Sequence, residues 1–83
     1  MAGPNTLNYG DTVSYPTWLF GNTKLFVRNP DEHYPGKISV AVAGQSEDVL
    51  VYGGRTNHIE RYWGGVEVNI YNIGGPTLVV WTE

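Results

Sequence analysis

The segment from Val66 to Thr82 constrains the fold of this chain more than any other part. Residues 66–71 alternate between aliphatic and other side chains, residues 72–76 are turn formers, and residues 78–81 are apolar at every position. Alternation predicts a strand with one buried face, whereas a continuous apolar run predicts a strand covered on both faces. Because one sheet in so short a chain gives little cover on two sides, the segment favours a two-layer sandwich and a partner subunit.

Glycine and proline punctuate the sequence at short intervals, with eleven glycines and five prolines in 83 residues. No stretch of helical length repeats apolar residues at the spacing of an amphipathic helix. We therefore expect one all-β domain over residues 1–83, a small antiparallel β-sandwich of immunoglobulin-like or jelly-roll-like type. This likeness is architectural and implies no function. About seven short strands are predicted, at residues 12–15, 23–29, 37–43, 48–52, 56–63, 66–73 and 77–82.

The same pattern predicts the turns and the core. The Gly-Gly pairs at 53–54, 64–65 and 74–75 are typical of hairpin turns. Aliphatic positions of the strands face inward, while charged positions face outward and hinder association of sheet edges. Phe26 and Tyr71 fall on the outward phase. The predicted core residues are Leu25, Val27, Ile38, Val40, Val42, Val66, Val68 and Ile70.

Composition excludes several classes of protein. Cysteine is absent and histidine occurs twice, so the chain has no disulfide and cannot supply a four-ligand zinc site from thiolates and imidazoles. The formal net charge is −3 and the basic residues are scattered, which argues against nucleic acid as a partner. No apolar run approaches the length of a membrane span.

The first residues lack the basic and apolar regions of a signal peptide. Three explanations follow for where the protein works. We expect that the protein is cytoplasmic, that it leaves the cell by a non-classical route, or that a leader has been removed from the chain.

Residues that could perform catalysis are sparse, so we expect no enzyme. No cysteine nucleophile exists, and no serine stands in a Gly-x-Ser-x-Gly motif. His58 and Glu60 have a spacing that allows a hydrogen bond on an exposed strand, which is typical of a solvated pair. Acidic residues at 31–32 and 47–48 fall in predicted loops without the spacing of a known calcium loop. No cofactor is expected, and calcium stays open only as an ion shared between loops.

Aromatic residues make up 13% of the chain, which is more than a small core requires. An exposed ring can cover the apolar face of a sugar while nearby amides and carboxylates bind its hydroxyl groups. Exposed tyrosine and tryptophan also dominate interfaces between proteins. The surplus rings therefore indicate a binding partner of one of these two kinds.

Two functions are compatible with this pattern. The first is a non-catalytic, lectin-like module that binds carbohydrate through aromatic residues in or beside loops. The second is a structural or assembly protein that forms a symmetric homo-oligomer through aromatic contacts and its C-terminal strand. The predicted ligand-binding residues are Trp18, Tyr34, Tyr62 and Trp63, with Asn57, Asp31 and Glu60 as partners for hydroxyl groups.

Overall fold

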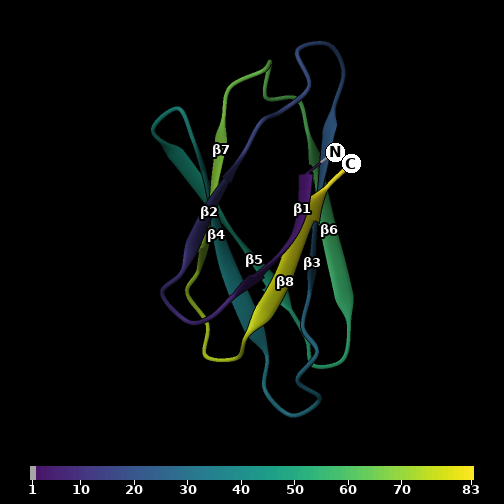
Figure 1. Cartoon of the computed structure of the whole chain (residues 1–83), viewed down its shortest axis with the longest axis vertical. Helices are drawn as coiled ribbons and strands as arrows, with labels where there is room; N and C mark the ends of the chain where they lie inside the picture. Colours follow the sequence, from purple (N-terminus) through teal and green to yellow (C-terminus); the bar gives the residue numbers. More distant parts are fainter. Residues whose placement is uncertain (1) are drawn as a thin grey trace.

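The computed structural model describes residues 2–83 and consists of eight β-strands, with no helix in this range. The strands are β1 (Ala2–Leu7), β2 (Thr12–Tyr15), β3 (Thr23–Arg28), β4 (Gly36–Val42), β5 (Gln45–Val51), β6 (Thr56–Arg61), β7 (Val68–Asn72) and β8 (Leu78–Thr82). They form two four-stranded sheets, in the orders β1-β8-β3-β6 (sheet A) and β2-β7-β4-β5 (sheet B), which pack face to face (Figure 1). The expected all-β sandwich is confirmed.

The order in which the strands pair identifies the type of sandwich. β1 pairs with β8, β2 with β7, β3 with β6 and β4 with β5, all antiparallel. Each strand of the first half of the chain therefore pairs antiparallel with a strand of the second half. Two further antiparallel pairs, β3 with β8 and β4 with β7, complete the sheets. A long hairpin rolled up in this way is a jelly roll, one of the two types that the sequence left open.

β1 is the strand that the sequence pattern did not predict, so the chain has eight strands rather than seven. Gly3 and Pro4 disfavour a regular strand, but β1 is an edge strand of sheet A, where a missing backbone donor is tolerated. Gly3 has a φ of 84°. A Cβ atom there would lie 2.8 Å from the Tyr15 hydroxyl and 2.9 Å from the Val80 carbonyl oxygen. Only glycine fits at this position.

The other strands lie within a few residues of their predicted positions, but β5 starts early. It begins at Gln45 because Ala43 and Gly44, both with positive φ, form a tight turn after β4. Glu47 and Asp48 therefore lie in a strand, so their placement in a loop was wrong.

The prediction that the Gly-Gly pairs form hairpin turns is also wrong. They lie between β5 and β6, between β6 and β7, and between β7 and β8, and each of these connections passes from one sheet to the other. Among residues 2–83, β4 and β5 are the only consecutive strands that pair with each other. The Gly-Gly pairs therefore lie in turns between layers rather than within one sheet.

The core lies between the sheets and is built from the alternating aliphatic positions. Burial of such side chains contributes about 1.5–3 kcal/mol each to folding. Of the residues predicted to lie inside, Val42 is half-buried, and the prediction for Val66 is wrong. Val66 is 46% exposed because it precedes β7 in a loop. The buried hydrophobic residues are Leu7, Tyr15, Leu25, Val27, Ile38, Val40, Val49, Val51, Val68, Ile70, Leu78 and Val80.

β8 meets only half of the expectation that it is covered on both faces. It is an inner strand of sheet A, and Leu78 and Val80 are fully buried between the sheets. Val79 and Trp81 lie on the outer face of sheet A and are half-buried. The outer face of this sheet is therefore partly open to solvent.

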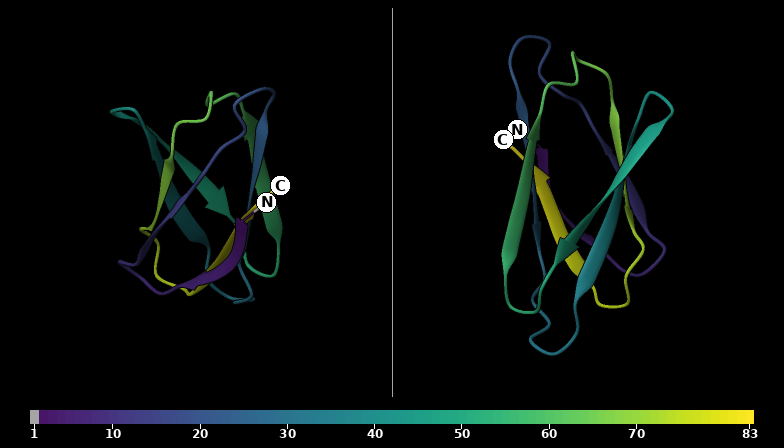
Figure 2. Two further views of the ribbon diagram at one scale, coloured as in Figure 1. Left: turned by 45° about the horizontal axis from the view of Figure 1, so that its top comes forward. Right: turned by 180° about the vertical axis from the view of Figure 1, so that it is seen from behind.

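The loops gather at the two ends of the sandwich (Figures 1 and 2). The tip contains residues 16–22, 43–44 and 62–67, and the base contains residues 8–11, 29–35, 52–55 and 73–77. Two buried asparagines hold the base together. Asn29 donates to the carbonyl oxygens of Tyr34 and Val51. Asn72 donates to main-chain carbonyls at the end of β1 and in the β7–β8 loop. Residues 2–83 include no helix long and apolar enough to cross a membrane.

Candidate functional site

Two loops meet at the tip and hold each other in place. The hydroxyl of Thr17, in the β2–β3 loop, donates a hydrogen bond of 2.8 Å to the carbonyl oxygen of Val66, in the β6–β7 loop. The hydroxyl of Tyr62 makes a longer bond of 3.4 Å to the carbonyl oxygen of Leu19. Gly65 has a φ of 82°, and a Cβ atom there would lie 3.2 Å from the Leu19 side chain. Glycine at this position lets the loops pack closely.

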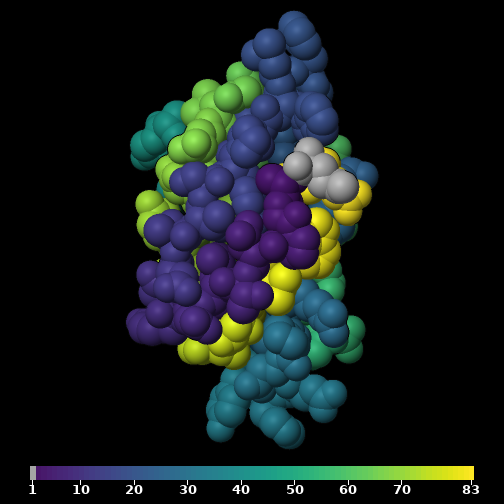
Figure 3. Space-filling model, in the orientation of Figure 1, coloured from purple at the N-terminus to yellow at the C-terminus, as the bar shows by residue number. Residues whose placement is uncertain are grey.

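The tip also carries a group of exposed apolar side chains. Phe20 is 87% exposed in the β2–β3 loop, which projects beyond the sandwich at the top of Figure 3. The other members of the group are Trp18, Leu19, Tyr62 and Val66. Large exposed apolar side chains that gather in one region are typical of interaction sites.

A cleft of about 320 Å³ opens beside these loops. One wall comes from β4 and the start of β5, and the other from the residues that follow β6. The cleft exists because β5 and β6 are neighbouring edge strands that belong to different sheets and do not pair with each other. It is lined by Val40, Val42, Ala43, Gln45, Ser46, Glu47, Tyr62, Trp63 and Val66.

The cleft combines aromatic rings with polar groups. Tyr62 is 64% exposed, whereas Trp63 packs against the hydrophobic core and is only partly accessible. Gln45, Ser46 and Glu47 add an amide, a hydroxyl and a carboxylate from β5. This combination suits a ligand that has an apolar face and several hydroxyl groups.

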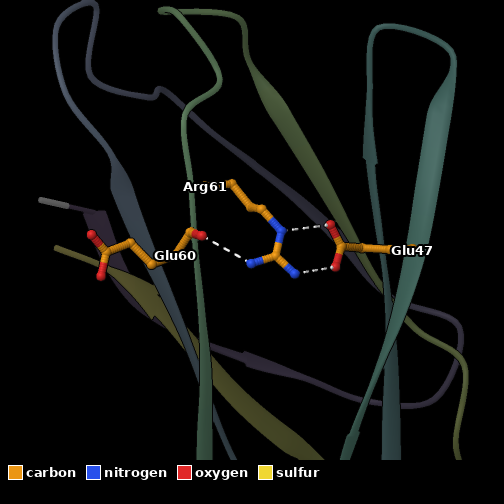
Figure 4. A network of polar contacts seen from close by, with 3 residues as sticks. All are labelled: Glu47, Glu60 and Arg61. Atoms are coloured by element: carbon orange, nitrogen blue, oxygen red, sulfur yellow. Dashed lines mark hydrogen bonds and ion pairs between the residues drawn. The ribbon is translucent and has the colours of Figure 1, made fainter.

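An ion pair joins the two sheets next to the cleft (Figure 4). Nη2 and Nε of Arg61, at the end of β6, lie 3.0 and 3.3 Å from the two carboxylate oxygens of Glu47, on β5. Nη1 of Arg61 donates to the main-chain carbonyl oxygen of Glu60 at 2.9 Å. Both side chains of the ion pair are nearly half exposed, so it adds at most about 1 kcal/mol to stability. Its main effect is to fix the position of the Glu47 carboxylate.

The structure brings together only some of the predicted ligand-binding residues. Tyr62 and Trp63 share the cleft. Trp18 lies at the same end of the sandwich, but in a separate shallow hollow beside Thr23. Tyr34 and Asp31 lie at the base, where they line a hollow of about 370 Å³. The predicted set is therefore divided between the two ends of the molecule.

The Asp31 carboxylate already accepts hydrogen bonds within its own loop. Its Oδ1 accepts hydrogen bonds from the main-chain N–H groups of His33 at 2.8 Å and Tyr34 at 3.1 Å. These two bonds, that of His33 above all, lower the pKa of the Asp31 carboxyl below its usual range. The carboxylate thus stabilises a turn, and its second oxygen alone is left for a ligand.

Asn57 and Glu60 also serve the fold. Nδ2 of Asn57 donates to the carbonyl oxygen of Leu50 at 2.8 Å, which links β6 to β5 across the sheets. Glu60 accepts a hydrogen bond of 3.1 Å from Asn22. His58 makes no hydrogen bond to Glu60 in the described chain, and its ring stacks on another residue of sheet A instead. None of these side chains lines the cleft.

Residues 6–83 match the model of a protein family, so the match extends over nearly the whole chain. The chain belongs to the DUF8244 family, a family of unknown function. No curated protein and no solved structure matches it. Because the family carries no known activity, a functional proposal has to come from the geometry of the cleft.

Gln45, Ser46 and Glu47 are polar residues of the cleft that the sequence pattern did not identify as ligand-binding residues. It treated residues 44–47 as a loop, which hid their position on a strand facing Tyr62. The signal that could have found them is Ala43-Gly44, because a two-residue turn would start the next strand at Gln45. In residues 2–83, no three His, Asp or Glu side chains are grouped closely enough to hold a metal ion.

Proposed function

We propose that this chain is a non-catalytic module that binds carbohydrate in the cleft at the tip. The observation that carries the proposal is the position of Tyr62 and Trp63 beside Gln45, Ser46 and Glu47 in one cleft of about 320 Å³. This volume is at the lower end for small-molecule sites, so it fits a mono- or disaccharide better than a long chain. Jelly rolls include lectin domains, although the fold alone implies no function.

The proposed contacts follow from the chemistry of the lining residues. The exposed ring of Tyr62 covers the apolar face of the sugar, and the accessible part of Trp63 extends this apolar surface. Glu47 accepts hydrogen bonds from sugar hydroxyls, which are stronger when the acceptor is a carboxylate. Arg61 orders that carboxylate before the ligand arrives, which reduces the entropy lost on binding.

Tyr62 is the residue with which to test this proposal. Trp63→Ala would remove part of the core packing together with any ligand contact, so its effects on binding and on stability could not be separated. Tyr62 is 64% exposed, and its removal leaves the core intact. Tyr52, which is 65% exposed in the β5–β6 turn at the base, provides a matched control.

The experiment is a titration of the protein with a panel of mono- and disaccharides, followed by tryptophan fluorescence because Trp63 lies in the cleft. We expect at least one sugar to change the fluorescence of the wild-type protein. Tyr62→Ala should weaken this binding at least about tenfold, which corresponds to about 1.4 kcal/mol. Glu47→Gln, which keeps the shape and removes the charge, should also weaken it by roughly tenfold. Tyr52→Ala should bind like the wild type.

Two results would count against the proposal. One is the absence of a response to every sugar in the panel. The other is an equal effect of Tyr62→Ala and Tyr52→Ala, since the cleft would then have no special role. Thermal unfolding of each variant establishes that a loss of binding does not reflect a loss of folded protein.

A further inference from the structure

The β2–β3 loop presents three consecutive apolar side chains, those of residues 18–20, to solvent. Each of them is more than half exposed. Polar contacts hold the loop on both sides of this apex. The main-chain N–H of Trp18 donates to the Thr23 hydroxyl at 2.9 Å, and the side chain of Asn22 donates to Glu60 at 3.1 Å. The folded protein therefore keeps the apolar apex in this position.

The two ends of the molecule differ in charge. Among residues 16–22, 43–44 and 62–67, which form the loops of the tip, Glu67 is the one charged side chain. The loops of the base are richer in charge, with Asp11, Asp31, Glu32 and Arg55. The tip is thus an apolar and almost uncharged end, and the apolar β2–β3 loop projects from it (Figure 3).

The polar side chains of this loop are already bonded inside the molecule. The hydroxyl of Thr17 donates to Val66, and the amide of Asn22 donates to Glu60. A protein interface contains about one hydrogen bond per 100–200 Å², and the loop has few polar side chains left to form them. A bilayer does not require such bonds, because its hydrocarbon takes up apolar side chains and its headgroup level accommodates tryptophan and tyrosine. The projecting loop therefore fits a bilayer surface better than a protein.

The cleft at the tip is continuous with the apolar group. Tyr62 and Val66 belong to both, since they line the cleft and are also exposed members of the group. The hydroxyl of Tyr62 lies 3.4 Å from the carbonyl oxygen of Leu19, so the aromatic wall of the cleft contacts the projecting loop. One ligand with a hydroxylated part and an apolar part can therefore use both surfaces.

We propose that the tip contacts a lipid bilayer and that the cleft binds the sugar headgroup of a glycolipid in it. This inference rests on the proposed carbohydrate function and specifies how the sugar is presented. Leu19 and Phe20 enter the hydrocarbon, while Trp18 and Tyr62 lie among the headgroups. The cleft of about 320 Å³ suits the mono- or disaccharide of a simple glycolipid. The net charge of −3 favours neutral over anionic lipids.

Flotation of the protein with phosphatidylcholine vesicles tests this inference. The vesicles contain no glycolipid or a small fraction of glucosylceramide, galactosylceramide or lactosylceramide. The wild-type protein should bind vesicles with one of these glycolipids at least about tenfold more tightly than phosphatidylcholine alone, because the cleft and the loop then bind together. Phe20→Asp should weaken this binding at least about tenfold, since a charge replaces an apolar ring in the membrane.

Tyr9→Asp is the matched control, because Tyr9 is an aromatic residue of the base that is 69% exposed. It should bind vesicles like the wild type. Titration with soluble glucose, galactose and lactose separates the cleft from the loop. Phe20→Asp should bind the soluble sugar like the wild type, since Phe20 does not line the cleft. This result would also show that the variant is folded. Tyr62→Ala should weaken the binding of both the soluble sugar and the vesicles.

The inference and the proposed carbohydrate function fail in different ways. If a soluble sugar binds but F20D and Y9D bind glycolipid vesicles equally, the inference is overturned and the carbohydrate site stands. If vesicles bind equally with and without glycolipid, the assignment of the headgroup to the cleft is overturned. If neither a soluble sugar nor any vesicle binds, both are overturned, and the apolar loop is left to a protein partner.

Discussion

Tyr15 shows how a single buried polar residue connects the two sheets. Its side chain is 3% exposed, and its hydroxyl lies 2.6 Å from Oδ1 of Asn5 and 2.9 Å from the carbonyl oxygen of Val80. It therefore ties β2 of sheet B to the β1–β8 edge of sheet A. Burial raises the pKa of the Tyr15 hydroxyl, because the charged phenolate would lose its hydration.

This raised pKa makes stability depend on pH at the alkaline end. The folded state keeps the Tyr15 proton to a higher pH than the unfolded state, whose tyrosine has a pKa of about 10. The contribution of Tyr15 to the free energy of unfolding is thus complete below about pH 10 and falls as the pH rises through the folded-state pKa. Tyr15→Phe should cost about 1–2 kcal/mol at neutral pH, and this difference should shrink above about pH 10.

Urea unfolding of the wild type and of Tyr15→Phe, from neutral pH to about pH 11, measures this difference. Tyr52→Phe is the control, because Tyr52 is 65% exposed and its substitution should have no such effect. If the difference in free energy of unfolding between the wild type and Tyr15→Phe stays constant with pH, the pKa of Tyr15 is not raised by burial.

At the level of elements, the base depends on a close approach between two loops. The β5–β6 turn packs on the β3–β4 loop, where the N–H of Gly54 donates to the carbonyl oxygens of Asn29 at 2.9 Å and Asp31 at 3.0 Å. A Cβ atom on Gly53 would lie 2.8 Å from the main-chain oxygens of Asp31 and Glu32. These are backbone atoms, so they cannot yield by a change of rotamer.

Gly53→Ala should therefore destabilise the protein by about 1–3 kcal/mol, since it forces the two loops apart. Gly75→Ala is the control, because no atom lies within 4 Å of the position of a Cβ at Gly75. It should be neutral or stabilising by up to about 1 kcal/mol through the entropy of the unfolded chain. Chemical denaturation measures both values, and equal effects of the two substitutions would contradict this account of the base.

At the scale of the whole molecule, stability comes from the single layer of side chains between the sheets. The chain has 83 residues and no cysteine, so neither size nor a disulfide compensates for a weak core. β8 is central to this core because it pairs with β1 and β3 and directs Leu78 and Val80 inward. The cooperativity of unfolding should therefore depend on β8.

Leu78→Ala should lower the free energy of unfolding by about 2–5 kcal/mol, which is much of the stability of a domain of this size. Leu50→Ala removes the same atoms from a side chain that is 50% exposed on sheet B, so it should cost less than about 1 kcal/mol. Thermal unfolding followed by circular dichroism compares the two variants. A similar loss in both would mean that the layer between the sheets does not dominate stability.

The sequence by itself determined the strands and most of their inward faces. A side-chain period of two is a local property, so Leu25, Val27, Ile38 and Val40 were correctly placed in the core. Prediction from the sequence failed where local signals conflict with the tertiary context. β1 contains Gly3 and Pro4 and exists because β8 offers a partner at the sheet edge.

Only the tertiary structure decided which strands share a sheet and which side chains share a site. Alternation shows that a residue faces inward but not which strand lies beside it, and the pairing of β1 with β8 or β3 with β6 joins distant parts of the chain. For the same reason the sequence named Tyr62 and Trp63 but missed Glu47, their neighbour in the cleft. Glu47 lies on β5 of sheet B, whereas Tyr62 and Trp63 follow β6 of sheet A. Their proximity therefore depends on how the long hairpin rolls up.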